Sequence, residues 1–136
     1  MKSSAHATFE LKYHLVLVTK YRHKVLTAEM LEHLREHFAE LLVSWRCELI
    51  EFGGEPDHVH LLFEAHPALE MAGLVNNLKT ASARKLKKPF AEHLKPFYCK
   101  PGFWHRAYYL GSVGNASLET VKRYVEQQRG AARPAA

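Results

Sequence analysis

The chain has 136 residues, of which 47% are hydrophobic, and its formal net charge is +5. This length fits one domain with an ordinary apolar core. No apolar run approaches the ~18–20 residues that span a bilayer, and the N-terminus carries no apolar signal segment. Two scattered cysteines, Cys47 and Cys99, indicate a reducing compartment without a disulfide framework. We therefore expect a cytoplasmic protein whose charge favours a polyanionic partner.

Alternating and apolar runs predict four strands. The first alternates at its start and becomes apolar over residues 15–18, as in a strand covered on both faces. Residues 53–56, Gly-Gly-Glu-Pro, form so short a connection that the second and third strands must be an antiparallel hairpin. The predicted strands span residues 9–20, 47–53, 57–65 and 105–113.

Apolar residues at helical spacing predict three helices. Thr27 is a natural N-cap for the first, Pro67 opens the second, and Ser117 caps the last. Residues 89–103 hold three prolines, which indicates an irregular loop with room for one short helix. The predicted helices span residues 28–45, 68–87 and 118–129.

The resulting order, β-α-β-β-α-β-α, is typical of an α+β fold. It matches a ferredoxin-like, split β-α-β antiparallel sheet with helices on one face and an added C-terminal helix. The first and third strands would be central. We expect a single domain over residues 1–130 and a disordered tail over 131–136.

Two histidines stand one residue apart in P-D-H-V-H-L-L-F, residues 56–63. Side chains alternate along a strand, so His58 and His60 should project from one face, close enough to share a cation. Asp57 should face the other side, and Glu64 lies ~13 Å beyond His60 at ~3.3 Å per residue. Such a pair alone serves many metals, and one such imidazole is often only a hydrogen-bonded, half-buried side chain.

Tyr124 and Gln128 lie one turn apart on one face of the last predicted helix. Alone, the tyrosine would be a packing residue and the glutamine a solvated one. They become candidate site residues because a metal site with two histidine ligands would still need a third ligand. Two imidazoles, one amide oxygen and a nucleophilic phenol make a site suited to cutting a phosphodiester.

The character of these ligands favours particular ions. Neutral nitrogen and oxygen ligands with open positions suit Mn²⁺ or Mg²⁺, which would polarise and orient a phosphate. A zinc site would want a further strong ligand. The phenol has an unperturbed pKa of about 10, so it needs a base or a nearby cation, and the sequence does not identify the base.

Basic residues gather at the end of the second predicted helix and just after the first strand. Cations at a helix C-terminus complement its dipole, but five within ten residues exceed that need, which favours a phosphate-contacting face. Aromatic residues between 97 and 109 could stack on unpaired bases, although such residues are more often core. The candidate nucleic-acid contacts are Lys20, Arg22, Lys79, Arg84, Lys85, Lys87 and Lys88.

Three blocks together carry a family resemblance. They are Y-H-L-V-L-V-T-K-Y-R-H-K-V-L (13–26), P-D-H-V-H-L-L-F (56–63) and G-S-V-G-N-A-S-L-E-T-V-K-R-Y-V-E-Q-Q (111–128). In this order and spacing, the chain resembles the small single-strand-specific tyrosine transposases of bacterial insertion sequences, in the HUH nuclease superfamily. The resemblance assigns His58, His60 and Gln128 as metal ligands and Tyr124 as the nucleophile. Ala107 departs from the family pattern, where a serine is expected.

The resemblance implies a metal-dependent transposase that cleaves and rejoins single-stranded DNA through a 5′-phosphotyrosine intermediate, without ATP. It further implies a homodimer that recognises hairpins at the ends of an insertion sequence. The tyrosine helix of one subunit would dock on the other, with Gly111, Gly114 and Asn115 as the flexible connection.

Three other functions are compatible with parts of the pattern. A replication initiator or relaxase-like nickase would use the same chemistry on another target, although the short chain favours a transposase. A noncatalytic nucleic-acid-binding module would not depend on Tyr124. A zinc hydrolase built on His58 and His60 would need a carboxylate or cysteine ligand that the sequence does not place.

Overall fold

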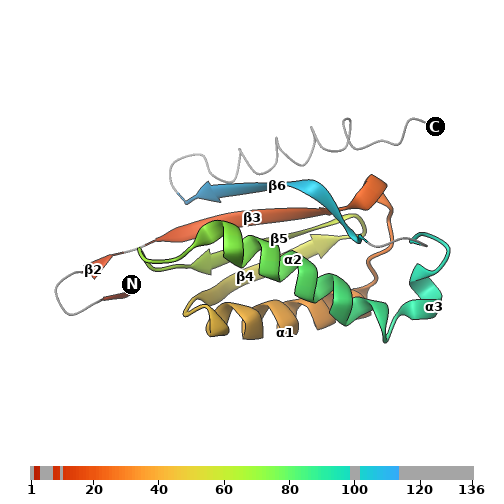
Figure 1. Cartoon of the computed structure of the whole chain (residues 1–136), viewed down its shortest axis with the longest axis horizontal. Helices are drawn as coiled ribbons and strands as arrows, with labels where there is room; N and C mark the ends of the chain where they lie inside the picture. Colours follow the sequence, from red (N-terminus) through yellow and green to blue (C-terminus); the bar gives the residue numbers. More distant parts are fainter. Residues whose placement is uncertain (1, 4–7, 10, 99–101, 114–136) are drawn as a thin grey trace.

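The computed structural model describes residues 2–3, 8–9, 11–98 and 102–113. Its centre is a four-stranded antiparallel sheet in the order β4-β5-β3-β6 (Figure 1). The prediction that the first and third long strands are central is confirmed, since these are β3 and β5. The strands of this sheet are β3 (Lys12–Thr19), β4 (Glu48–Glu55), β5 (His58–Glu64) and β6 (Trp104–Ser112).

A small pair of strands, β1 (Lys2–Ser3) and β2 (Thr8–Phe9), precedes the main sheet and was not predicted. The first predicted strand begins at residue 9, whereas this residue belongs to β2 and the long strand begins at Lys12. A 3-10 turn, η1 (Lys20–Arg22), follows β3 and was also not predicted. Both features are too short to leave a periodic pattern in the sequence.

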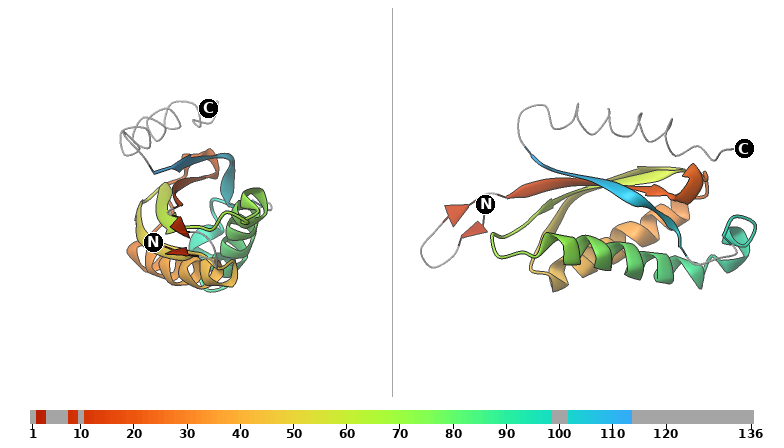
Figure 2. Two further views of the ribbon diagram at one scale, coloured as in Figure 1. Left: turned by 90° about the vertical axis from the view of Figure 1, so that its left-hand side faces the viewer. Right: turned by 45° about the horizontal axis from the view of Figure 1, so that its top comes forward.

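Two long helices, α1 (Ala28–Ser44) and α2 (Met71–Lys87), cover one face of the sheet (Figures 1 and 2). The first agrees with its prediction within one residue, and the Thr27 hydroxyl accepts the Met30 N–H as its cap. The second begins at Met71 and not at residue 68, because the Glu70 carboxylate caps it by accepting the Gly73 N–H at 2.6 Å. Helices on one face of an antiparallel sheet confirm the predicted α+β class.

The core lies between the sheet and these two helices. Alternate residues of β3 and β5, such as Leu17 and Leu61, meet Phe38 of α1 and Leu78 of α2, and all four are at most 1% exposed. Burying each side chain of this size stabilises the fold by ~1.5–3 kcal/mol. The packed face holds the sheet rigid, so the positions of side chains on the opposite face are set by the strand register.

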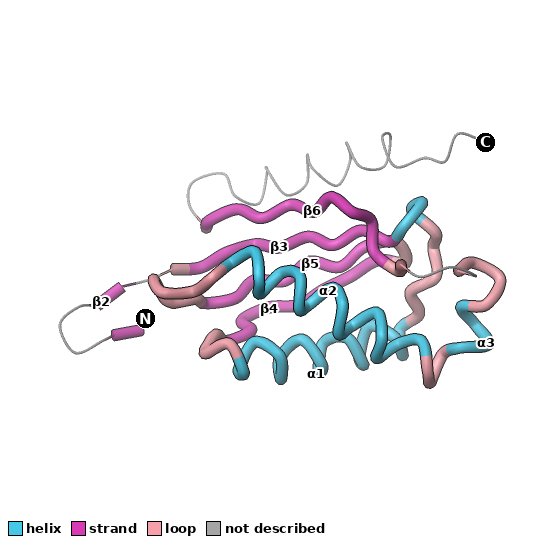
Figure 3. Tube along the Cα trace, in the orientation of Figure 1, coloured by secondary structure: helices cyan, strands magenta, loops and turns pink. Residues whose placement is uncertain are grey.

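The segment after α2 is irregular, as predicted, and contains one short helix, α3 (Ala91–Leu94). Figure 3 shows that the loops lie mainly at the two ends of the sheet. Phe103 and Trp104 are buried, and the Trp104 Nε1–H donates to the Ser82 hydroxyl at 2.9 Å. These two aromatic residues are therefore part of the core and do not form the stacking surface considered above.

Several predicted features lie outside the described residues: the last helix with Tyr124 and Gln128, the tail over 131–136, Gly114, Asn115 and Cys99. Cys47 is buried and forms no disulfide. Within the described ranges, no helix combines the length and apolar character needed to cross a membrane.

Candidate active site

His58 and His60 lie on β5, one of the two central strands, on the face opposite to the helices. His58 stands between Val18 of β3 and Glu55 of β4 in the register, and His60 stands between Val16 and Gly53. The intervening residues of β5 point into the core. The two imidazoles therefore share one face of the sheet, as strand alternation requires.

Asp57 holds the ring of His58. Its Oδ1 lies 2.9 Å from His58 Nδ1, and both side chains are buried. A carboxylate can only accept a hydrogen bond, so the proton resides on Nδ1 and the Nε2 lone pair is left for a metal ion. The expectation that Asp57 faces away from the histidines is wrong, because this residue precedes the strand and alternation does not apply to it.

Arg22 holds the other side of the same carboxylate. Its guanidinium lies 2.7 Å from Asp57 Oδ2, and the two side chains are 7% and 9% exposed. Arg22 was predicted as a nucleic-acid contact, and in this structure its guanidinium is buried against Asp57. Two backbone hydrogen bonds keep the ion pair together, since the Thr19 N–H donates to the Asp57 carbonyl and the Leu26 N–H to the Pro56 carbonyl.

The ring of His60 lies against the backbone of β4. An ideal Cβ at Gly53 would stand 2.5 Å from His60 Nε2, so only a glycine leaves room for this ring position. Burial lowers the pKa of His60, the charges of His58 and His14 lower it further, and those of Glu51 and Glu55 oppose the shift. A lowered pKa favours the neutral imidazole, which is the form that binds a metal.

His14 is a residue of this face that sequence reasoning missed. It pairs with Leu62 in the register, next to the pair Val16–His60. The available signal was the period-two pattern of β3, which puts His14, Val16 and Val18 on one side. Sequence alone did not show that this side adjoins the two histidines, because it does not give the pairing register.

The two histidines supply part of the ligand set that a divalent ion would need. Their imidazoles, one fixed through Nδ1 by Asp57, have the character of metal ligands. Across the described ranges, no three His, Cys, Asp or Glu side chains gather closely enough to hold a metal ion. These residues therefore do not supply the carboxylate or cysteine that a zinc hydrolase would need. The remaining predicted ligand, Gln128, lies outside them.

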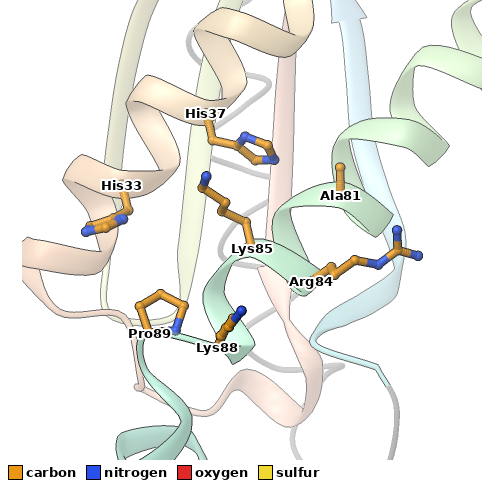
Figure 4. Close-up of a pocket in the computed structure, with 7 residues that line it drawn as sticks. All are labelled: His33, His37, Ala81, Arg84, Lys85, Lys88 and Pro89. Carbon is orange, nitrogen blue, oxygen red and sulfur yellow. The ribbon is translucent and has the colours of Figure 1, made fainter.

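Most of the predicted nucleic-acid contacts lie on the helical layer, away from the histidines. A pocket of about 540 Å³ between α1 and α2 is shown in Figure 4. Its lining residues are His33, His37, Ala81, Arg84, Lys85, Lys88 and Pro89. No carboxylate is among these described residues, and His37 Nε2 is buried without a hydrogen-bond partner among them.

A second groove, of about 580 Å³, runs along the other side of α2 beside the start of β6. Lys79, Arg84 and Lys87 are among its lining residues. The Lys79 ammonium donates to the Arg106 carbonyl at 3.0 Å, and burial lowers its pKa. The cations of α2 thus line two hollows, one on each side of this helix.

The sequence model of the family described as "Transposase IS200 like" matches residues 7–128. The ISDra2 transposase TnpA of Deinococcus radiodurans is 31% identical over 128 residues, which cover 94% of this chain and 91% of that protein. The transposase for insertion sequence element IS200 of Salmonella typhimurium is 29% identical over 127 residues, which cover 93% of this chain and 82% of that protein.

Two solved structures are similar. The crystal structure of a transposase candidate from Deinococcus radiodurans R1 superposes with a TM-score of 0.84 at 31% identity, covering 94% of this chain and 98% of that one. A REP-associated tyrosine transposase bound to a REP hairpin has a TM-score of 0.58 at 10% identity. The match covers 93% of this chain and 69% of that one, and it shows a shared fold. From the family match and these identities, the chain belongs to the IS200-like transposase family and is a DNA transposase.

Proposed function

We propose that this transposase is metal-dependent and cleaves and rejoins single-stranded DNA through a 5′-phosphotyrosine intermediate on Tyr124. The observation that carries the proposal is the fixed pair His58 and His60, with the Nδ1 of His58 held at 2.9 Å by the buried Asp57 carboxylate. That hydrogen bond leaves Nε2 of His58 as the ring nitrogen available to a metal ion. A hydrogen bond of this kind also occurs in buried structural histidines, and the second imidazole on the same face, that of His60, is what favours an ion site.

Each residue then has a defined task. His58, His60 and Gln128 would hold Mg²⁺ or Mn²⁺, and the bound ion would supply Lewis-acid polarisation of the scissile phosphate. The phenol oxygen of Tyr124 attacks phosphorus, its proton passes to a base, and a P–O bond forms as the bond to the 3′ oxygen breaks. The departing oxygen takes a proton and becomes a free 3′-OH. A 3′-OH later attacks the phosphotyrosine, restores the phosphodiester and releases the phenol.

The basic hollows beside α2 support DNA as the partner on the helical side of the sheet. Arg84, Lys85 and Lys88 around the first hollow and Lys79 and Lys87 in the second would contact phosphates. One of the similar structures, the REP-associated tyrosine transposase, is bound to a REP hairpin. We extend that partner to this chain and propose that its homodimer binds hairpins at the ends of an insertion sequence, with active sites composed from two subunits.

The test is formation of a covalent adduct. The chain is incubated with labelled single-stranded DNA from the ends that flank its own gene, with Mn²⁺ or with a chelator. We expect an adduct that needs both the ion and Tyr124, so that Tyr124→Phe and chelation each abolish it. Tyr108→Phe, a change at an exposed tyrosine of β6, should leave it intact. Adduct formation by Tyr124→Phe, or none by the unaltered chain, would contradict the proposal.

A further inference from the structure

The loop after β3 holds an aromatic residue in a rare backbone conformation. Tyr21 and Arg22 have φ values of 62° and 56°, in the left-handed region that residues other than glycine seldom adopt. The side chain of Arg22 is buried against Asp57. The side chain of Tyr21 is 48% exposed. Such strain is retained where surrounding structure enforces it, and it gathers at functional positions.

Tyr21 is the first ring of an aromatic strip. Its ring meets that of His23 edge to face at 5.7 Å, and His23 lies 5.3 Å from Phe97, measured between ring centroids. Phe97 is 38% exposed. Three rings from two distant segments thus form a contiguous row whose neighbouring planes are inclined by 69° and 56°, and the residues at its two ends are exposed.

Buried contacts hold the strip from below. The ring of Tyr98 packs on His23 at 5.4 Å and on Phe103 of the core at 5.2 Å. Its hydroxyl donates to the Lys20 carbonyl at 3.3 Å, and burial raises the pKa of Tyr98 to about 12, so the phenol remains a donor. The strip is therefore preorganised, which reduces the ordering cost of binding.

Cations accompany these rings. The Lys20 ammonium lies 5.3 Å from the centroid of the Tyr21 ring, and Lys24 is exposed in the same loop. Exposed aromatic faces beside lysines are the combination that binds unpaired nucleotides, since bases stack on the rings and phosphates meet the charges. A duplex, whose bases are already stacked, does not offer such faces.

The strip is also tied to the candidate active site. Arg22 follows Tyr21 directly and holds Asp57, which holds the ring of His58. The Thr19 N–H, at the start of the same loop, donates to the Asp57 carbonyl at 2.9 Å. A base on Tyr21 would therefore lie at the end of the sheet where the histidine strand begins.

We propose that Tyr21, His23 and Phe97 form a stacking platform for an unpaired base of single-stranded DNA, with Lys20 and Lys24 meeting its phosphates. The platform rests on the proposed function and adds a base-binding subsite beside the histidine pair. It selects single strands by the faces of their bases and not by their edges, so it tolerates different sequences.

The test compares two oligomers with the same number of phosphates, an oligodeoxythymidylate and an abasic oligomer, by fluorescence anisotropy. Tyr21→Gly removes the ring and suits a positive φ. Base–aromatic stacking is worth about 5- to 150-fold in affinity per base. We expect the variant to lose roughly that factor for the oligodeoxythymidylate and to keep its affinity for the abasic oligomer. Tyr21→Phe, which retains the ring, should bind both oligomers as the unaltered chain does.

A control outside the strip is Val43→Ala, since Val43 is an exposed apolar residue in the last turn of α1. It should not change the ratio of the two affinities. If Tyr21→Gly does not fold, Tyr21→Asn, which also tolerates this backbone, replaces it. An unchanged ratio in the folded variant, or an equal loss for both oligomers, overturns the platform.

The other possible occupant of the strip is a second copy of the chain, and sedimentation velocity tests for it. If Tyr21→Gly dissociates the assembly while DNA affinity is unchanged, the strip contacts another copy of the chain and the platform is overturned. The binding assay needs no cleavage. If the platform is overturned, the covalent adduct test of the proposed function still stands. If no covalent adduct forms, the two binding affinities can still be measured.

Discussion

The imidazole of His60 lies across Gly53, its cross-strand neighbour on β4. The absence of a side chain at Gly53 is what permits this position, because a Cβ there would stand 2.5 Å from His60 Nε2. A Cβ added at the next glycine, Gly54, would stand 2.6 Å from Leu31 Cδ2 of α1. Gly53 therefore makes room for the candidate site on one face of β4, and Gly54 makes room for the core on the other face.

Gly53→Ala should displace the His60 ring and weaken metal binding. A loss of about 10- to 100-fold in Mn²⁺ affinity is expected, comparable to the loss of a group that orients a metal ligand. The backbone tolerates alanine here, and the ring can move, so the free energy of unfolding should change by less than about 1 kcal/mol. Calorimetric titration with Mn²⁺ and urea unfolding measure the two effects.

Gly54→Ala is the paired control for that substitution. Its Cβ collides with the packed Leu31, and overpacking a core costs about 1–3 kcal/mol. Metal affinity should stay near that of the unaltered chain. Equal Mn²⁺ affinities for the two alanine variants would refute the assigned role of Gly53.

Asp57→Asn should destabilise the fold through its effect on Arg22. The substitution leaves a buried guanidinium without its counterion, which costs about 3–5 kcal/mol in comparable buried pairs. The free energy of unfolding of the double variant, Asp57→Asn with Arg22→Met, should fall by less than the sum of the decreases in the two single variants. Urea unfolding of all four proteins gives the coupling free energy. Additive losses would show that the two side chains do not act as a pair.

Stability should decline in mildly acidic solution, with His37 as one cause. Burial lowers the pKa of His37, and the charge of Lys85 lowers it further. Below about pH 6.5 the unfolded chain binds a proton at this position that the folded chain binds only at lower pH. The contribution of His37 is therefore present in full above that pH and is lost as the pH falls toward the folded-state value.

His37→Gln isolates this contribution. Urea unfolding between about pH 7.5 and 5.5 should show a smaller loss of stability for the variant than for the unaltered chain. His60, whose pKa is also lowered, contributes with the same sign in both proteins and cancels in the comparison. Identical pH dependences would mean that His37 does not couple protonation to folding.

Mixed dimers test the composite active site. A Tyr124→Phe subunit keeps the histidines and lacks the nucleophile, while a His58→Ala subunit keeps the nucleophile and lacks a ligand. If the tyrosine of one subunit serves the histidines of the other, a mixed dimer regains one complete site and forms the covalent adduct. Neither variant alone should form it. If mixing restores no adduct, the tyrosine helix acts within its own subunit in the state tested.

Local patterns were sufficient for most of the architecture. Alternation in β3 and β5 and helical spacing in α1 predicted the strands, the helical layer and the two central strands. The hairpin between the second and third predicted strands is present, but the connection predicted over residues 53–56 is too long, because Gly53, Gly54 and Glu55 belong to β4 and pair with β5. These features depend on neighbours within a few residues, whose preferences the sequence carries directly. The start of α2 was predicted too early because Pro67 is a common opening residue, whereas the capping carboxylate is that of Glu70.

By itself, the amino-acid sequence determined the order of the long strands and helices from β3 to β6, the shared face of His58 and His60 and, through its motifs, the family. Only the tertiary structure decided that Asp57 orients His58, that Arg22 is buried against that carboxylate and that Gly53 makes room for His60. These relationships join segments far apart in the chain. They depend on strand register and on the path of a strained loop, which no local periodicity encodes.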